Sequence, residues 1–196
     1  MYSLSYFAIY KPYGMLSQFT GEQGQSSLMN LDFDFPKDVY PIGRLDADSE
    51  GLLLLTNERR LTASLLDPLA GHEREYWVQV EGQVTDEALH KLSSSMSISI
   101  NGKLHQTLPC RAKRIDPPLN LPDRNPPVRF RKTVPDEWIT LTLKEGKNRQ
   151  VRKMTAAVGL PTLRLIRHRI GKLVLPGWIP GQVTPIDRSA FLRSMS

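Results

Sequence analysis

Apolar positions along the chain follow strand patterns in several places. GLLLLT at residues 51–56 is an unbroken apolar run, which predicts a strand buried on both faces. YFAIYKPYG at 6–14 predicts a strand that ends in a turn, because Pro and Gly interrupt it. REYWVQVEG at 74–82 alternates apolar and polar residues, as a half-buried strand does. SISINGKLHQ at 97–106 predicts a hairpin, since Asn-Gly favours the tight turn between two alternating strands.

Further strands and several short helices complete the pattern. The additional strands are predicted at 137–146 and 162–171. Spacing and capping residues predict helices at 25–31, 58–66, 85–95, 148–159 and 187–195. The expected caps are Ser26 or Ser27, Asn57, Thr85 and, at a helix end, Gly159. Because these strands and helices do not alternate as βαβ units, the predicted fold class is α+β with a mixed, mostly antiparallel sheet.

A proline-rich segment separates the two halves of this pattern. Six prolines occur between Asp116 and Pro135, so the segment is predicted to be an extended loop or arm. Its arginines, Arg124, Arg129 and Arg131, are placed to grip a phosphate backbone. The alternative is a solvent-exposed linker with no binding role.

Charge is concentrated in one part of the chain. The net charge is +6, and the stretch from Lys144 to Lys172 holds nine Lys and Arg residues against one acid, Glu145. Such a patch is typical of proteins that bind polyanions, although charge runs also form ordinary solvated surfaces. Alternation in TLRLIRHRIG places Arg164 on a surface shared with the core, which favours nucleic acid as the partner.

Composition excludes several classes of protein. With 196 residues, 40% hydrophobic and 23% charged, the chain can bury a core as an ordinary globular protein does. No apolar run approaches the roughly 20 residues of a membrane span. The N-terminus lacks a signal-peptide pattern, so we expect a cytoplasmic protein. The single Cys110 cannot form an internal disulfide and has no partners for a zinc site, so it is expected to be a packed side chain.

Three functional interpretations are open for the acidic residues that precede the leucine run. Asp46, Asp48 and Glu50 match the first positions of a calcium loop, but the twelfth position is Asn57 and the intervening leucines would be exposed, so calcium is rejected. The second interpretation is a magnesium site for phosphoryl transfer. It is weakly supported, because the sequence contains no Gly-rich phosphate-binding loop and no second cluster of ligands. The third interpretation is a single catalytic carboxylate, Asp46, held rigidly at the edge of a buried strand and kept ionised by an arginine.

The predicted helix that ends at Gly159 offers that arginine. Its apolar stripe consists of Val151, Met154 and Val158. Arg149 and Lys153 project roughly opposite the stripe and suit phosphate contacts. Arg152 lies on the flank of the stripe, where its side chain can reach a pocket and pair with a buried acid.

Four motifs together resemble one family. KPYG at 11–14, GRLDADSEGLLLLTN at 43–57, EREYWVQVEG at 73–82 and EGKNRQVRKMTAAVGLPTLRLIR at 145–167 resemble the ribosomal RNA pseudouridine synthases. The similarity is greatest to the branch that contains the small-subunit enzyme A and the large-subunit enzymes B, E and F. RNPPVRFRKTVP and the absence of an N-terminal S4 module point to the E group. The resemblance implies the pseudouridine synthase fold, in one catalytic domain over 1–196 or as two lobes that meet at a cleft.

The resemblance also implies roles for individual residues. Asp46 matches the nucleophilic aspartate, and Arg152 matches the basic residue that pairs with it. Tyr76 matches the active-site tyrosine that stacks against the uracil. Arg44 matches the arginine that contacts RNA and helps to fill the space left by the flipped base, and Leu165 matches the apolar residue packed against that base.

The implied activity is site-specific isomerisation of uridine to pseudouridine in large-subunit (23S) ribosomal RNA, by a monomer that needs no cofactor and no metal. Two other classes remain open. A catalytically silent RNA-binding protein would share the scaffold, and a metal-dependent nuclease would use Asp46, Asp48 and Glu50. A glycosidase would need a second carboxylate that faces Asp46; Glu50 is the only near candidate, and its sequence context shows no sign that it is buried.

Overall fold

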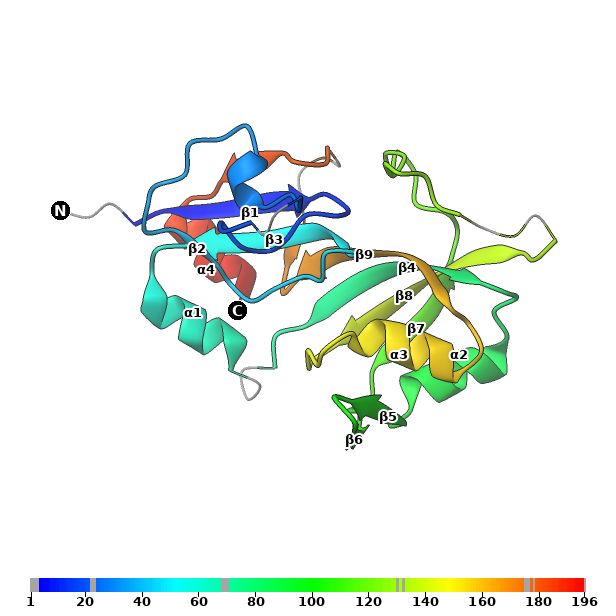
Figure 1. Cartoon of the computed structure of the whole chain (residues 1–196). Helices are drawn as coiled ribbons and strands as arrows, with labels where there is room; N and C mark the ends of the chain where they lie inside the picture. The colour runs from blue at the N-terminus through cyan, green and yellow to red at the C-terminus, as the bar shows by residue number, and fades with distance from the viewer. Residues whose placement is uncertain are drawn as a thin grey trace. The chain divides into compact units, whose positions relative to one another are not determined.

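The computed structural model describes residues 4–21, 24–67, 71–129, 131, 133–174, 177 and 179–195. The chain divides into two compact units (Figure 1). Unit 1 is made of Met1–His72 and Arg167–Ser196, and unit 2 is the intervening Glu73–Ile166. Strand β9 (Thr162–Ile170) starts in unit 2 and ends in unit 1.

The sheet strands of unit 1 run in the order β11–β1–β3–β9. Their bounds are β1 Tyr6–Lys11, β3 Glu50–Thr56 and β11 Val183–Pro185. Two short strands extend this part: β2 (Tyr40–Pro41) pairs with β3, and β10 (Leu173–Val174) pairs with β9. β1 is antiparallel to both of its neighbours, β3 and β11.

The leucine run is buried because both faces of β3 are covered. Ile9 of β1 lies opposite Leu53, and Phe7 lies opposite Leu55. These side chains pack with Leu28 of the short 3-10 helix η1 (Leu28–Asn30) and with neighbouring phenylalanines. On the other face of β1, the Tyr6 ring packs against Phe191 of helix α4 (Arg188–Met195), with ring centroids 5.2 Å apart. Every residue of β3 is buried, so the predicted two-faced strand is confirmed.

The sheet strands of unit 2 run in the order β9–β4–β8–β7. Their bounds are β4 Arg74–Glu81, β7 Arg111–Ile115 and β8 Asp136–Leu143. β8 is antiparallel to both β4 and β7. Helix α2 (Asp86–Ser93), the hairpin β5–β6 (Ser97–Ile100 and Lys103–Gln106) and helix α3 (Gln150–Ala157) complete the unit.

The predicted α+β class with mostly antiparallel pairing is confirmed, and so are most elements. Thr85 caps α2 through a bond from the Ala88 amide to its Oγ1, 3.1 Å long. The hairpin turns at Asn101 and Gly102, both with positive φ, as the Asn-Gly pair predicts. Among the described residues, no helix combines the length and the apolar character that a membrane crossing requires.

One predicted cap is wrong. Helix α1 (Arg59–Leu66) begins after Glu58, and Asn57 does not cap it. The Asn57 side chain instead accepts a hydrogen bond from the Ser5 amide (2.9 Å) and donates one to Asp38 (3.2 Å). Its amide therefore ties down the start of β1, and the helix begins without a side-chain cap.

Candidate functional site

Asp46 lies in a tight turn immediately before β3. The Ser49 amide donates to the Asp46 carbonyl oxygen at 3.0 Å and closes the turn. On the other side, Leu45 is fixed by Ser17, whose hydroxyl donates to the Leu45 carbonyl (2.8 Å) and accepts from its amide (3.0 Å). Asp46 is half-buried and Arg44 is exposed. A carboxylate held by its backbone on both sides is a rigid group from which to act on a substrate.

A buried lysine stands behind this turn. Lys11, with 0% of its surface exposed, donates from Nζ to the carbonyl oxygens of Pro12 (2.9 Å), Met15 (2.8 Å) and Ala47 (3.4 Å). The Gly14 amide donates to the same Ala47 carbonyl at 2.7 Å. The KPYG turn and the Asp46 turn are therefore joined through the residue that follows Asp46. This agrees with a structural role for KPYG.

Other charges are buried around Lys11. The pKa of Lys11 is lowered to about 8, mainly by burial and also by the nearby Arg167, while Glu50, Asp48 and Asp46 oppose the shift. Glu50 is only 2% exposed and accepts a hydrogen bond from the Tyr10 hydroxyl at 3.2 Å. No sequence pattern indicated this burial, and the expectation that Glu50 is unburied is wrong.

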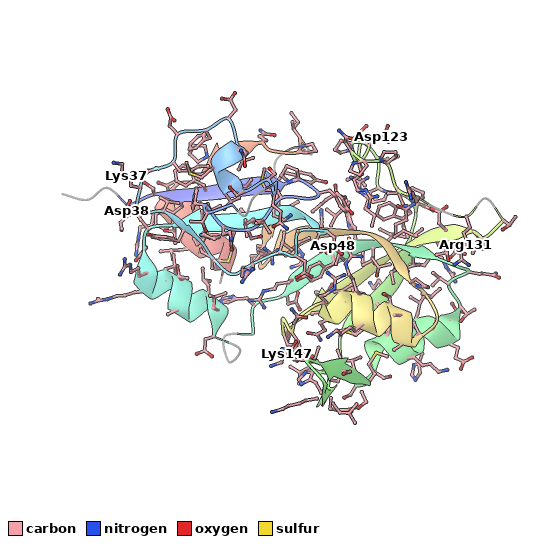
Figure 2. All side chains as sticks on the ribbon, viewed as in Figure 1. Lys37, Asp38, Asp48, Asp123, Arg131 and Lys147 are labelled. Carbon is pink, nitrogen blue, oxygen red and sulfur yellow. The ribbon has the colours of Figure 1, made fainter. Side chains whose placement is uncertain are left out.

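Burial of Glu50 also bears on the metal alternative. Of the three acids that a nuclease would use, Asp46 and Asp48 are half-buried (Asp48 is labelled in Figure 2), but Glu50 is turned into the protein. Within the described ranges, no group of three or more His, Cys, Asp or Glu residues is arranged to hold a metal ion. The second carboxylate of a glycosidase would also have to be open to substrate, which Glu50 is not.

The buried lysine leads to a prediction about pH and stability. Because the folded-state pKa is about 8 and the usual value is 10.5, the unfolded chain binds more protons between these values, and stability from this group rises with pH across that window. Relative to Lys11→Met, the wild type should gain on the order of 3 kcal/mol between pH 8 and 10.5. Urea unfolding of both proteins across this range measures the difference. A constant difference would show that Lys11 titrates normally in the fold.

In unit 2, the predicted site residues lie on β4, α3 and β9. Tyr76 is 9% exposed and lies opposite Leu141 in the β4–β8 register. Leu165 of β9 is 5% exposed. Arg152 is half-buried, and its Nη1 donates to the Thr162 carbonyl oxygen at 3.4 Å.

The apolar stripe of α3 follows the predicted wheel, whereas Lys153, predicted to point to solvent, is half-buried. Val151 and Met154 are 3% and 0% exposed, as expected of the apolar stripe. Arg149 is exposed just before α3 and Lys153 is half-buried one turn later. Asp46 and Arg44 belong to unit 1 and the other predicted residues to unit 2, and the roles of all of them stay predictions.

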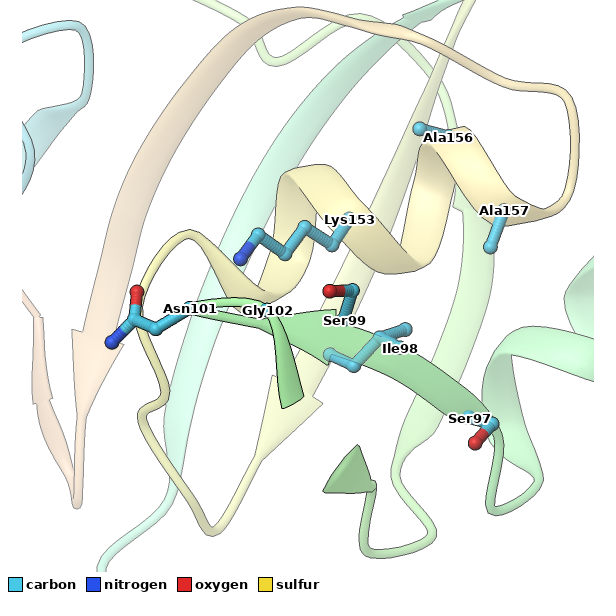
Figure 3. Close-up of a pocket in the computed structure, with 8 residues that line it drawn as sticks. All are labelled: Ser97, Ile98, Ser99, Asn101, Gly102, Lys153, Ala156 and Ala157. Atoms are coloured by element: carbon cyan, nitrogen blue, oxygen red, sulfur yellow. The ribbon is translucent and has the colours of Figure 1, made fainter. Parts of the chain in front are cut away.

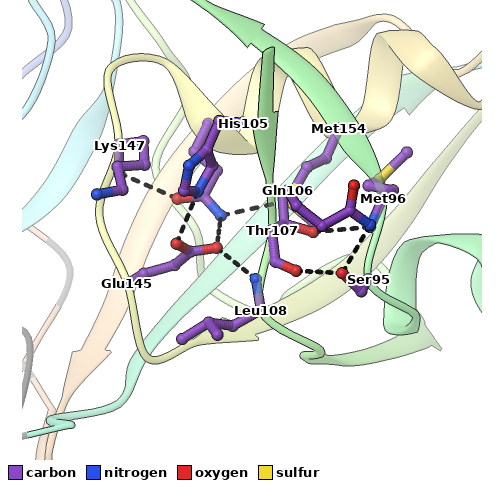
Figure 4. Close-up of polar contacts among 10 residues, drawn as sticks. Ser95, Met96, His105, Gln106, Thr107, Leu108, Glu145, Lys147 and Met154 are labelled. Carbon is purple, nitrogen blue, oxygen red and sulfur yellow. Dashed lines mark hydrogen bonds and ion pairs between the residues drawn. The ribbon is translucent and has the colours of Figure 1, made fainter.

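Glu145, the single acid of the basic segment, is the centre of a network in unit 2 (Figure 4). It is 8% exposed, and its carboxylate accepts from the Leu108 amide (2.8 Å) and from Gln150 Nε2 (2.7 Å). His105 Nε2 lies 3.0 Å from its other oxygen. The Gln150 oxygen in turn accepts from the Lys147 amide at 3.0 Å. This network holds together strand β6, the loop of residues 144–149 and the start of α3. The sequence did not predict it.

The proline-rich segment is bound to β9. Arg164 is 6% exposed and donates from Nη2 to the Pro122 carbonyl at 2.9 Å. Arg124 donates to the carbonyls of Pro126 (2.8 Å), Pro127 (3.0 Å) and Leu163 (3.4 Å). These two arginines hold the segment in place, so it is not a free linker.

The remaining arginines of that segment face solvent. Arg129 is exposed, and Arg131, labelled in Figure 2, is exposed with Nε 3.7 Å from Glu81 Oε1. A surface pair at this distance is weak, so Arg131 can exchange it for another anion. Phosphate contact therefore stays a prediction that fits Arg129 and Arg131 better than Arg164.

Comparisons with known proteins agree with the motifs. The family model for RNA pseudouridylate synthase matches residues 5–157. A ribosomal large subunit pseudouridine synthase E from Xanthomonas axonopodis pv. citri is 48% identical over 170 residues, which cover 87% of this chain and 87% of that protein. The protein of the same name from Vibrio parahaemolyticus is 46% identical over 172 residues, 88% of this chain and 69% of that one.

A solved structure has the same fold. The crystal structure of a pseudouridylate synthase superimposes with a TM-score of 0.78 over 100% of this chain and 75% of that chain, at 24% sequence identity. The fold expected from the motifs is therefore confirmed.

Proposed function

Because the chain belongs to the RNA pseudouridylate synthase family, we propose that it converts uridine to pseudouridine at a specific position of large-subunit (23S) ribosomal RNA, with Asp46 as the nucleophile. The observation that carries this proposal is the family match, which includes the Asp46 turn and the strand that follows it. The rigid backbone on both sides of Asp46 supports its role, because a nucleophile must be held in place to act.

The reaction exchanges one glycosidic bond for another. The uracil N1–C1′ bond breaks, the base turns, and a C5–C1′ bond forms; the C5 proton is lost and N1 gains one. No co-reactant is needed, because the uracil is both the leaving group and the returning nucleophile. A base inside a helix is out of reach, so the target nucleotide must be flipped out at a cost of roughly a few kcal/mol.

Each proposed residue has a distinct part in this reaction. Asp46 acts in its ionised form, by attack on C1′ or by removal of the 2′ proton. Arg152 stabilises the ionised carboxylate and its orientation. Tyr76 offers a ring for stacking and a hydroxyl that can relay the C5 proton. Arg44 contacts the RNA beside the flipped nucleotide, and Leu165 packs against the base.

The partner and setting follow from the same family. Ribosomal RNA is the substrate class, and the exposed basic residues Arg129, Arg131 and Arg149 supply phosphate contacts together with the half-buried Lys153. The buried Arg164 contributes by holding the proline-rich segment that carries Arg129 and Arg131. We also propose that the chain acts in the cytoplasm as a monomer and that its two units serve as one catalytic domain.

Nucleoside analysis of treated RNA tests the proposal. Unmodified large-subunit rRNA, free or in particles, is incubated with the protein with and without excess chelator and is checked for strand cleavage. It is then digested to nucleosides, which are separated by liquid chromatography. About one pseudouridine per RNA molecule should form as uridine disappears, with and without chelator, and the strand should stay uncleaved. Cleavage that stops in chelator would indicate a nuclease, and binding without any new nucleoside in either substrate would indicate a silent RNA-binding protein.

A further inference from the structure

Unit 2 contains a groove on the side of α3 that faces the hairpin β5–β6 (Figure 3). It has a volume of about 500 Å³. The helix contributes Ala156 and Ala157, both exposed, so this wall is low and smooth. The hairpin contributes Ser97, Ile98 and Ser99. A wide groove with methyl groups on one wall and hydroxyls on the other is suited to an extended, amphipathic chain.

The polar groups of the groove are available to a ligand. Across the part of the chain that the structure describes, the side chains of Ser97, Ser99, Asn101 and Lys153 make no hydrogen bond and no ion pair. In Figure 3 the Lys153 side chain runs along the groove toward the end that carries Asn101. These groups offer donors to an anion and both donors and acceptors to sugar hydroxyls.

The charge near the groove is positive. Residues 88–115, the segment that includes the hairpin, contain five Lys or Arg residues and no Asp or Glu, although none of these basic residues lines the groove. On the other wall, the only acid between Lys144 and Lys172 is Glu145, and its carboxylate is buried in the network with Leu108 and Gln150. Among the described residues that line the groove, Lys153 alone is charged and none is acidic. An anionic polymer is the complementary ligand.

The groove is also pre-organised. Glu145 connects His105 of β6 to Gln150 at the start of α3, so the hairpin and the helix are held at a fixed separation before any ligand binds. A site that is already ordered loses less conformational entropy when it is filled.

We propose that this groove binds a ribose–phosphate segment of the substrate RNA away from the nucleotide that is modified. Lys153 contacts a phosphate, the serine hydroxyls and Asn101 contact phosphate and 2′-hydroxyl oxygens, and the two alanine methyl groups pack against ribose. Recognition through backbone and 2′-hydroxyl groups is the usual way in which proteins bind structured RNA. The inference rests on RNA being the substrate and concerns affinity, whereas the proposed function concerns chemistry.

The first test places an acid on the exposed helix wall. Ala157→Glu should weaken binding to unmodified 23S rRNA transcript about tenfold and raise KM by a similar factor, with kcat nearly unchanged, because repulsion acts on docking and not on the reacting bond. Ala63→Glu, at an exposed position of helix α1 in unit 1, is the matched control and should change neither. Equal affinity of the two variants would overturn the proposal.

The second test introduces no acid, so its result does not depend on whether the fold tolerates one. Lys153→Gln should reduce the slope of log affinity against log salt by about 0.7 to 0.9, the loss of one phosphate contact. An unchanged slope would contradict the phosphate contact.

The third test is protection from alkylation. A thiol introduced by Ser99→Cys should be protected from iodoacetamide by the transcript, and one introduced by Ala63→Cys should not. The natural Cys110 contributes little background, because burial raises its pKa to about 11. Equal protection at both positions would count against the groove. Each of the three tests has a binding readout, so each can be carried out even if no pseudouridine forms, a result that would overturn the proposed function alone.

Discussion

Replacement of Gly51 by alanine is expected to destabilise unit 1 strongly. Gly51 has a φ of +103°, and a Cβ placed there would lie 2.4 Å from the Arg167 carbonyl oxygen and 2.8 Å from its amide nitrogen. These are backbone atoms of β9 and cannot move aside cheaply. Backbone strain and overpacking together should cost about 4 kcal/mol or more, measured as the free energy of unfolding in urea.

Gly14→Ala is the matched control. Gly14 also has a positive φ, +80°, but no atom lies within 4 Å of the position that its methyl group would take. Only the backbone strain remains, so a cost of about 1 to 2 kcal/mol is expected. Equal losses of unfolding free energy in the two variants would show that close packing against Arg167 is not the reason why position 51 requires glycine.

Asp46→Asn is expected to abolish pseudouridine formation while RNA binding remains. An amide is neither a nucleophile nor a base, so the single-turnover rate should fall about a thousandfold or more, which corresponds to about 4 kcal/mol of transition-state stabilisation. The substitution preserves shape, and the turn is held by backbone groups of Leu45 and Ser49, so the fold should not change. Quench-flow with nucleoside analysis gives the rate, and filter binding gives the affinity.

The control for that variant is Asp48→Asn, two residues further along the same turn. It removes an equal charge from the surroundings of Lys11. The rate should fall less than about tenfold, because no reacting group is lost. A similar large loss in both variants would indicate that charge around the turn, and not the Asp46 carboxylate itself, is required.

Elements with strong local signals were predictable. The leucine run and the alternating strands are recognised from the order of apolar and polar residues within a few positions. The Asn-Gly hairpin is recognised from the backbone conformation that these two residues favour. The apolar stripe of Val151 and Met154 fixed the orientation of α3, and this placed Arg152 on its flank, where the structure has it half-buried.

What could not be predicted depends on tertiary contacts. Strand β7 was missed, because an edge strand such as RAKRI has too few apolar residues to show alternation. Burial of Glu50 depends on Tyr10, forty residues away in the sequence, and the role of Glu145 depends on His105, also forty residues away. Arg164 was assigned to RNA from charge and strand alternation, and neither signal showed that this buried side chain holds the proline-rich segment at Pro122.

The most direct test of uridine isomerisation by Asp46 is tritium release from C5-tritiated large-subunit rRNA, free and in particles, with chelator present. The wild type should release tritium in the presence of chelator, in an amount equal to the pseudouridine formed, and Asp46→Asn should release none. Absence of release from both substrates, release that chelator prevents, or equal release by Asp46→Asn would contradict uridine isomerisation by Asp46.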